Sequence, residues 1–237
     1  MNAIVQTTET VARVPRPAQR PIGQIASSAA VLHRSLVAAL DPAGASAETL
    51  RELRSQLILR WFGDQRALAV LGARAEDDAD SVAANLAITM AQLGEPTLII
   101  DANLRAPRQH ELFGLKSVFG LSDLLRNRDV HDQAILPVQA VDNLHVLCAG
   151  AVPANPQELV SRTPFQYLMK TLPERFRAII VATPPALSCA DAQIIAARTQ
   201  GCILITRRHQ TRVAEVEEIK GRLASGRATL VGGVIRE

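Results

Sequence analysis

The sequence is poor in aromatic residues, in cysteine and in long apolar runs. Phe, Trp and Tyr make up 3% of its 237 residues, and Tyr167 is the single tyrosine. Three cysteines, Cys148, Cys189 and Cys202, stand at neither metal-ligand nor disulfide spacing, which predicts reduced thiols in or beside strands. The chain contains no run of about 18 apolar residues and no signal peptide, so we expect neither a membrane span nor secretion.

A strong charge imbalance is also missing. The 26 Lys and Arg against 23 Asp and Glu give a net charge of +3, and the basic residues are scattered along the chain. This distribution argues against a nucleic-acid partner. Hydrophobic residues make up 48% of the chain, which is enough for a sizeable core, and the length favours one large domain with or without an arm.

The N-terminal part differs in character from the rest. Residues 1–23 are polar, contain three prolines and show no periodicity, which predicts a mobile arm. One short helix is expected within Gln24 to Leu40, ended by the DPAG turn at 41–44. Ser46 is expected to cap a helix that runs through Phe62. The predicted organisation is an arm over 1–45 and one domain over 46–237.

Apolar runs and amphipathic segments alternate from residue 67 onward. Strands are expected at 67–72, 96–102, 143–150, 177–183, 201–207 and 228–235. Helices are expected at 80–93, 122–126, 156–176, 190–198 and 212–224. Most strand runs are continuously apolar, which is typical of a parallel sheet covered on both faces. The sequence therefore predicts a three-layer α/β sandwich of the P-loop or doubly wound kind.

In such sheets, ligands bind beyond the carboxyl ends of the strands. Those ends fall at 71–81, 101–107, 150–159 and 182–185. Asp101 at the tip of the second strand could act on water or metal near a phosphate, with Arg105 touching an anion; alternatively the aspartate caps the next turn and the arginine is solvated. Pro156 after Asn155 is typical of a helix start. Asp191 follows the fourth strand end at the next helix.

Several motifs in order carry a family resemblance. They are AANLA at 83–87, LIIDANLRAPRQHELFG at 98–114, GLSDLL at 120–125, LCAGAVPANPQELV at 147–160 and VATPP with ADAQ between 181 and 193. From about Glu48 to the C-terminus, the chain resembles the bacterial protein-tyrosine kinases (BY-kinases), in the branch associated with chain-length determinants of exopolysaccharide synthesis. The resemblance implies a P-loop NTPase-like domain.

An early helix carries a further family pattern, E-x-x-R-x-x-R, which relatives use to pack subunits into rings. Here it reads Glu48, Arg51 and Arg54. Spacing of three places these side chains on one helical face, where they could pair across an interface. The alternative is an ordinary solvated charged face.

The phosphate loop of the family reads roughly A-x-P-G-E-G-K-S-T, with Arg for Lys in some members. Its glycines let backbone N–H groups cradle phosphate, its lysine reaches the outer phosphates and its hydroxyl holds Mg²⁺. Counted back from the AANLA helix, the glycine positions here hold Glu76 and Asp78. Ala79 replaces the lysine, Asp80 replaces the metal-binding hydroxyl, and Ser81 alone could supply an –OH.

The second carboxylate of the family is also replaced. Its third motif ends I-D-T-P, and here Ala182 stands at the aspartate position. Asp101 is retained as the family acid, but the second acid usual two residues later is Asn103. The resemblance alone implies ATP and Mg²⁺; the residues present predict that no cofactor binds and that Asp101 is insufficient for catalysis by itself.

Electrostatics favours the same conclusion. Arg74 and four acids leave residues 72–82 with a net charge of −3. One phosphate charge at about 4 Å from one carboxylate costs about 4 kcal/mol at an effective dielectric of 20, half of a micromolar binding free energy of about −8 kcal/mol. We expect a solvated acidic loop and no metal site, the alternative being that Asp77, Asp78 and Asp80 converge on a hard cation.

Many relatives phosphorylate a tyrosine-rich C-terminal tail, and this sequence ends in VGGVIRE after its last strand. Tyr167 is expected to be buried or half-buried within its helix. On this composition we expect no autophosphorylation of a tail.

The favoured hypothesis is a cytoplasmic pseudokinase of exopolysaccharide biosynthesis or export. It would partner a membrane chain-length determinant (a polysaccharide co-polymerase), form homo-oligomers and lie at the inner membrane through that partner. One alternative is an active ATP-dependent tyrosine kinase with an atypical nucleotide site. Another is a degenerate positioning-type ATPase. Such ATPases share the same sheet core, but this alternative requires a C-terminal amphipathic membrane helix.

Overall fold

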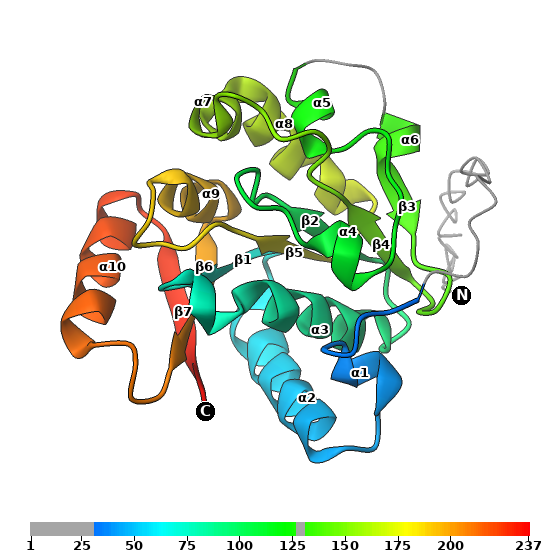
Figure 1. Ribbon diagram of the computed structural model, residues 1–237, viewed down its shortest axis with the longest axis horizontal. Helices are drawn as coiled ribbons and strands as arrows, with labels where there is room; N and C mark the ends of the chain where they lie inside the picture. Colours follow the sequence, from blue (N-terminus) through cyan, green and yellow to red (C-terminus); the bar gives the residue numbers. More distant parts are fainter. Residues whose placement is uncertain (1–30, 127–130) are drawn as a thin grey trace, which may run out of the picture.

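The computed structural model describes residues 31–126 and 131–237, so the predicted arm at 1–23 lies outside the described residues. The described part forms one seven-stranded sheet with helices on both faces (Figure 1). The strands are β1 (Ala67–Gly72), β2 (Thr97–Asp101), β3 (Ile135–Pro137), β4 (Leu144–Leu147), β5 (Ala178–Ala182), β6 (Gly201–Arg207) and β7 (Thr229–Arg236). Their spatial order is β3-β4-β2-β5-β1-β6-β7.

All neighbouring strands are parallel except β3, which pairs antiparallel with β4 at one edge. The continuous apolar runs arise because both faces of the central strands are buried. In β1, Leu68 and Val70 contribute to one core cluster, whereas Ala69 and Leu71 contribute to the other. The three-layer α/β prediction is confirmed. Strand β3, only three residues long, was not predicted.

One face of the sheet is covered by the N-terminal helices and α3 (Ala79–Ala91). The others are α1 (Val37–Leu40) and α2 (Ala45–Leu57), which continues as a π-helix over Ile58–Phe62. Residues that the sequence assigns to the arm pack here, because Leu36 and Ala38 are fully buried and the Ala38 amide donates to Asn85 Oδ1 at 2.9 Å.

The prediction that Ser46 caps the second helix is wrong. The N-cap is Gly44, in an extended conformation, and the helix begins at Ala45. The preceding turn is tight: the Gly44 amide donates to the Asp41 carbonyl, and a Cβ on Gly44 would lie 2.1 Å from an Asp41 carboxylate oxygen. The helix therefore starts directly after the turn, earlier than the serine signal indicates.

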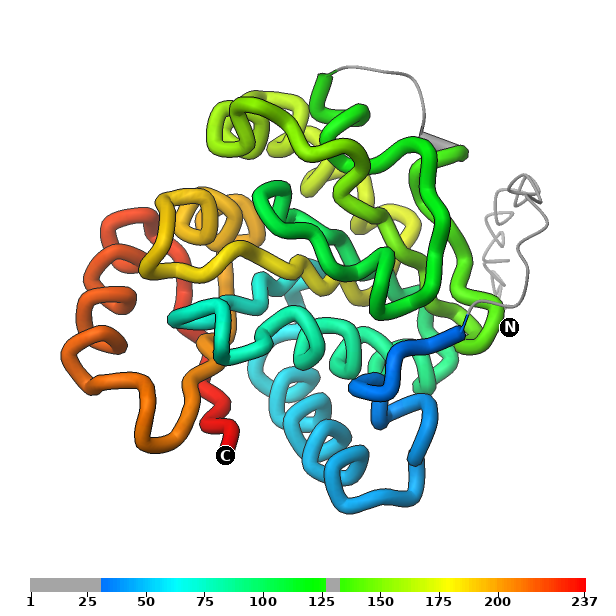
Figure 2. The backbone as a smooth tube through the Cα atoms, in the orientation of Figure 1, coloured from blue at the N-terminus to red at the C-terminus, as the bar shows by residue number. Residues whose placement is uncertain are grey.

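The opposite face carries α5 (Leu121–Leu124), α7 (Pro156–Ser161), α8 (Thr163–Thr171), α9 (Asp191–Thr199) and α10 (Val213–Ser225); Figure 2 shows the chain path between them. The single helix predicted over 156–176 is wrong. Arg162 is extended, and Pro164 in the first turn of α8 has no N–H with which to continue the previous helix. A 3₁₀ turn over Leu172–Glu174 completes this stretch.

The predicted burial of Tyr167 is also wrong, because its exposed fraction is 64%. The buried face of α8 is formed by Phe165, Leu168 and Met169, followed by Leu172. These residues follow the i, i+3, i+4, i+7 pattern of one helical stripe, and position 167 lies outside it. Cys148 and Cys202 are buried as expected, and burial raises the pKa of each thiol to about 12.

The parallel order brings the loops after β1, β2 and β5 to the same edge of the sheet. The loop after β1 contains a short 3₁₀ helix, η2 (Ala75–Asp77), and the loop after β2 leads into α4 (Gln109–Leu112). A four-residue helix, α6 (His131–Ala134), precedes β3. Over the described ranges, no helix is long and apolar enough to cross a membrane.

Candidate functional site at the carboxyl edge of the sheet

The segment at the phosphate-loop position connects β1 to α3 by a tight turn. The Asp77 carboxylate accepts the Arg74 amide at 2.7 Å and is buried. Asp78, the N-cap of α3, has φ 52°, in the left-handed region. Glycine adopts that conformation without steric cost, and Asp is among the few other residues that tolerate it. The backbone at position 78 is thus of the kind that the family glycine suits, although the side chain is an acid.

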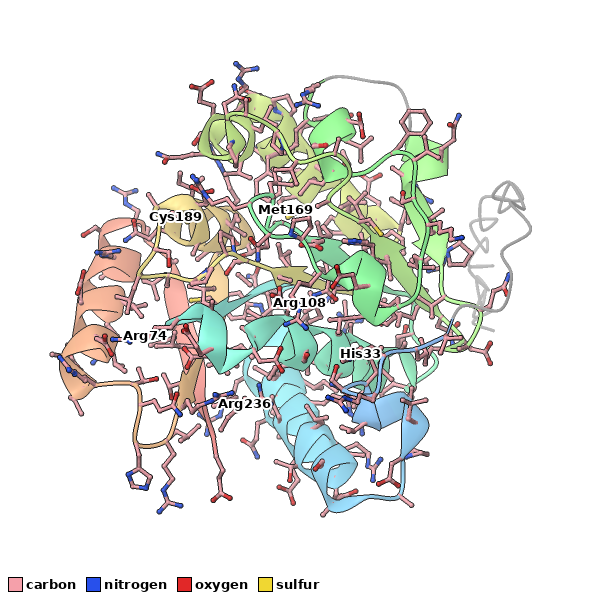
Figure 3. All side chains as sticks on the ribbon, in the orientation of Figure 1. His33, Arg74, Arg108, Met169, Cys189 and Arg236 are labelled. Carbon is pink, nitrogen blue, oxygen red and sulfur yellow. The ribbon has the colours of Figure 1, made fainter. Side chains whose placement is uncertain are left out.

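The Asp78 carboxylate is held by two arginines from distant segments. Its Oδ1 accepts Arg108 Nη1 at 3.1 Å, and its Oδ2 accepts Arg236 Nη1 at 3.1 Å. Arg236 also donates to the Asp77 carbonyl at 3.0 Å. Figure 3 labels both arginines, one from the loop before α4 and one from the end of β7. The acidic loop is therefore not simply solvated: its central acid is part of an ion-pair network.

The remaining hydroxyl of the loop is engaged by the same acid. Ser81 Oγ donates to Asp78 Oδ1 at 2.8 Å and lies 3.3 Å from Ser35 Oγ, and Ser81 is only 4% exposed. The Mg²⁺-binding role that Ser81 could have supplied is thus opposed by its present contacts. In the described ranges, no group of three or more His, Cys, Asp or Glu side chains is placed to hold a metal ion. The alternative in which Asp77, Asp78 and Asp80 converge on a cation therefore has no support.

Asp80 lies in the first turn of α3, facing the loop after β2. Its Oδ1 and the Oε1 of the fully buried Gln109 are both buried without a hydrogen-bond partner. Burial raises the pKa of Asp80 to about 6, opposed by the nearby Arg108 guanidinium and reinforced by Asp78. Side-chain hydrogen bonds from Asn103 and Gln109 also oppose the shift, because they favour the ionised carboxylate.

Asp101 ends β2 and is fully buried. Its carboxylate accepts three backbone amides, from Asn103 at 3.2 Å and from Arg108 and Gln109 at 2.9 Å each. Burial raises its pKa to about 7, although these amides oppose the shift; the neighbouring Asp80 raises it further. Asp101 thus caps the loop that follows β2, which is the second of the two alternatives that the sequence left open.

The end of β5 and the loop after β2 hold two further positions that the sequence singled out, Ala182 and Arg105. Ala182 ends β5 directly opposite Asp101 of β2 and is buried, so no carboxylate stands beside Asp101 from that strand. Arg105 forms a bidentate ion pair with Asp191 at the start of α9, with contacts of 2.8 and 3.2 Å. Arg105 is therefore committed to a side chain of the same molecule.

The E-x-x-R-x-x-R residues lie on α2. Arg51 pairs with Glu48 at 2.8 Å and donates to the Pro42 carbonyl, also at 2.8 Å. Arg54 donates to the Thr89 carbonyl at 2.9 Å and so caps the last turn of α3. Arg54 therefore has a structural contact within the chain, whereas Glu48 and Arg51 pair at the surface.

No protein-family model matches the chain. The chain is 31% identical over 197 residues to the putative tyrosine-protein kinase CapB of Staphylococcus aureus, covering 83% of this chain and 86% of that protein. It is 30% identical over 207 residues to the tyrosine-protein kinase YwqD of Bacillus subtilis, covering 86% of each. The chain belongs to the bacterial tyrosine-protein kinase family.

Solved structures agree with this assignment. The chimerical protein CapA2B2 superposes with a TM-score of 0.80 at 30% identity, over 86% of this chain and 89% of that one. The kinase domain of the Escherichia coli tyrosine kinase ETK gives 0.81 at 27% identity, over 85% and 79%. The septum site-determining protein MinD from Pyrococcus horikoshii, complexed with Mg-ADP, shares the fold alone, at 20% identity and a TM-score of 0.62.

The family implies ATP and Mg²⁺, and the residues of this member do not fit them. Position 79 offers a methyl group where the family lysine would reach phosphate, and Ala79 is buried. Arg108 and Arg236 are paired with Asp78, Arg74 is paired with Glu215, and Ala182 removes the second carboxylate. Sequence reasoning missed Arg108, Arg236 and Gln109. Arg236 stands far from the loop in sequence, and the parallel pairing of β7 with β6 at the end of the chain carries no local signal for this contact.

Proposed function

We propose that this protein is a pseudokinase of the bacterial tyrosine-protein kinase family that acts through protein contacts in exopolysaccharide biosynthesis or export. The single observation that supports this is the phosphate-loop position itself. It retains a left-handed residue before α3 but holds Asp78 in ion pairs with Arg108 and Arg236 and has Ala79 in place of lysine.

The partner proposed is a membrane chain-length determinant, and the protein would lie in the cytoplasm at the inner membrane through that partner. The link to polysaccharide rests on the family resemblance and on relatives such as the putative tyrosine-protein kinase in the cps region of Klebsiella pneumoniae, 30% identical over 207 residues. The chain matches only 28% of that relative's length, so activities of the longer protein enter here as proposals.

The nucleotide part of the proposal is tested by calorimetry with Mg·ATP and Mg·ADP. The native protein is compared with a variant carrying Glu76→Gly, Asp78→Gly and Ala79→Lys. A matched control carries the same glycines with Ala79→Gln, so that only the charge at position 79 differs. We expect no binding by the native protein and tighter binding by the lysine variant than by the glutamine control. Micromolar binding by the native protein would refute the pseudokinase and favour the active kinase with an atypical site.

The contact part is tested by sedimentation and by binding to cytoplasmic segments of a chain-length determinant. Arg51→Glu inverts a charge within the proposed interface motif, and Arg60→Glu makes the same change at an exposed position of the π-helix that follows α2. We expect Arg51→Glu to weaken self-association or partner binding and Arg60→Glu to leave both unchanged. Equal behaviour of the two variants would remove the assigned role of the motif.

A further inference from the structure

Asp78 is the point at which three separated parts of the chain meet. Its carboxylate receives Arg108 from the loop after β2 and Arg236 from the end of β7, each at 3.1 Å. Only 26% of the Asp78 side chain is exposed. Charges in such a partly buried place are screened less by salt than charges on the open surface.

The groups around Asp78 are those that recognise phosphate. Guanidinium groups bind carboxylate and phosphate oxygens with the same planar set of donors. Asp78 also stands at the N-terminus of a 13-residue helix, where the helix dipole favours negative charge. The place therefore has the attributes of an anion site, and the anion present is a side chain of the protein.

We propose that Asp78 is a tethered anion that occupies Arg108 and Arg236 and thereby excludes phosphate groups from the start of α3. The inference rests on the proposed function and names Asp78 as the residue that prevents phosphate binding. General repulsion by the acidic loop is a different explanation, because it predicts a gain from removing any nearby acid, including one that holds no arginine. The two explanations differ in what they assign to Glu76.

Glu76 provides the matched comparison. It carries the same charge, occupies the other glycine position of the family loop and is exposed. Its side chain forms no hydrogen bond or ion pair with any residue that the structure describes. It acts through charge on Arg74, which is itself paired with Glu215. Removing the charge of Glu76 changes repulsion without breaking an ion pair. Removing the charge of Asp78 breaks two ion pairs, although Arg236 keeps its contact with the Asp77 carbonyl and Arg108 keeps its attraction to Asp80.

The experiment measures binding of inorganic pyrophosphate to the full chain by calorimetry at low ionic strength, without metal. The proteins are the native chain, Asp78→Asn, Asp78→Gly, Glu76→Gln, and Asp78→Gly combined with Arg236→Gln. We expect both Asp78 variants to bind pyrophosphate at least about tenfold more tightly than the native chain. Glu76→Gln should change little, and Arg236→Gln should abolish the gain of Asp78→Gly.

Circular dichroism and thermal unfolding show whether each variant is folded. Asn tolerates the left-handed backbone nearly as well as Gly. Asp78→Asn therefore provides the test if Asp78→Gly does not fold stably. Equal gains in Glu76→Gln and Asp78→Asn would overturn the inference in favour of general repulsion. If folded Asp78 variants gain no pyrophosphate binding, the inference is overturned. The proposed function stays intact in that case as long as the native protein does not bind Mg·ATP. Micromolar Mg·ATP binding by the native chain would overturn the proposed function instead.

Discussion

The buried acid at the tip of β2 should make the protein less stable as the pH rises through neutrality. Burial raises the pKa of Asp101 from 3.8 to about 7. The folded protein therefore holds this proton to higher pH than the unfolded chain does. The stability contributed by the proton is fully present below pH 3.8 and is lost as the pH rises through about 7.

The size of the effect follows from the shift. Roughly three pKa units at about 1.36 kcal/mol each give a total of about 4 kcal/mol, of which about 3 kcal/mol falls between about pH 5 and about pH 8.5. Asp80, whose pKa burial raises to about 6, adds in the same direction at the acid end of this window. His145 acts oppositely, because burial lowers its pKa and the stability it contributes is lost as the pH falls below its ordinary value of 6.5.

The assay is urea unfolding followed by circular dichroism across this pH range, for the native protein and Asp101→Asn. Taking the difference between the two removes the contribution of His145. Asp101→Asn should flatten the decline in the free energy of unfolding between neutral and alkaline pH. Asp64→Asn, a change at an exposed acid, should leave the decline unchanged. A native stability that stays constant or rises from pH 5 to pH 8.5, or a full decline retained in Asp101→Asn, would refute the reasoning.

Three further predictions concern packing. Gly201→Ala should lower the free energy of unfolding by about 1–3 kcal/mol, because its Cβ would lie 2.3 Å from the Trp61 ring. Gly221→Ala in the open interior of α10 should raise the free energy of unfolding by up to about 1 kcal/mol. Urea titration compares the two variants. Arg54→Ala should cost about 1 kcal/mol through the lost contact with the Thr89 carbonyl, and exposed Arg60→Ala should cost little, by the same titration. Tyr167→Phe should shift stability by less than about 0.5 kcal/mol; a larger thermal shift would contradict its exposure of 64%.

The sequence was most informative where one local pattern decides the structure. Continuous apolar runs such as ALAV at 67–70 predict buried parallel strands because both faces of the strand need apolar side chains. The loop after β1 was located by motif order, and its altered chemistry was read from single positions such as Ala79. Predicted helix boundaries were wrong where a tight turn set the start of a helix in place of a capping serine, as at Gly44. They were also wrong where a proline interrupted a long helical pattern, as at Pro164.

Contacts between distant segments could not be predicted in the same way. Arg236 reaches Asp78 only because β7 lies beside β6 in the sheet, and Arg105 reaches Asp191 only because their two loops share one edge. The exposure of Tyr167 was wrongly predicted because composition does not report which side of α8 faces the core. Side-chain pairing across the sheet edge is a property of the assembled topology, and a single sequence carries little signal for it.

The position of β1 in the sheet has a consequence for how the chain is made. β1 lies between β5 and β6, so that Ala67 faces Ile179 and Ala69 faces Cys202. During synthesis, which proceeds from the N-terminus, β1 emerges well before β5 and β6 and acquires neither neighbour until they too have left the ribosome. Closing such long loops is slow, and an unpaired apolar strand can associate with other chains in the meantime. We therefore expect nascent chains ending before β5 to aggregate or to require a chaperone.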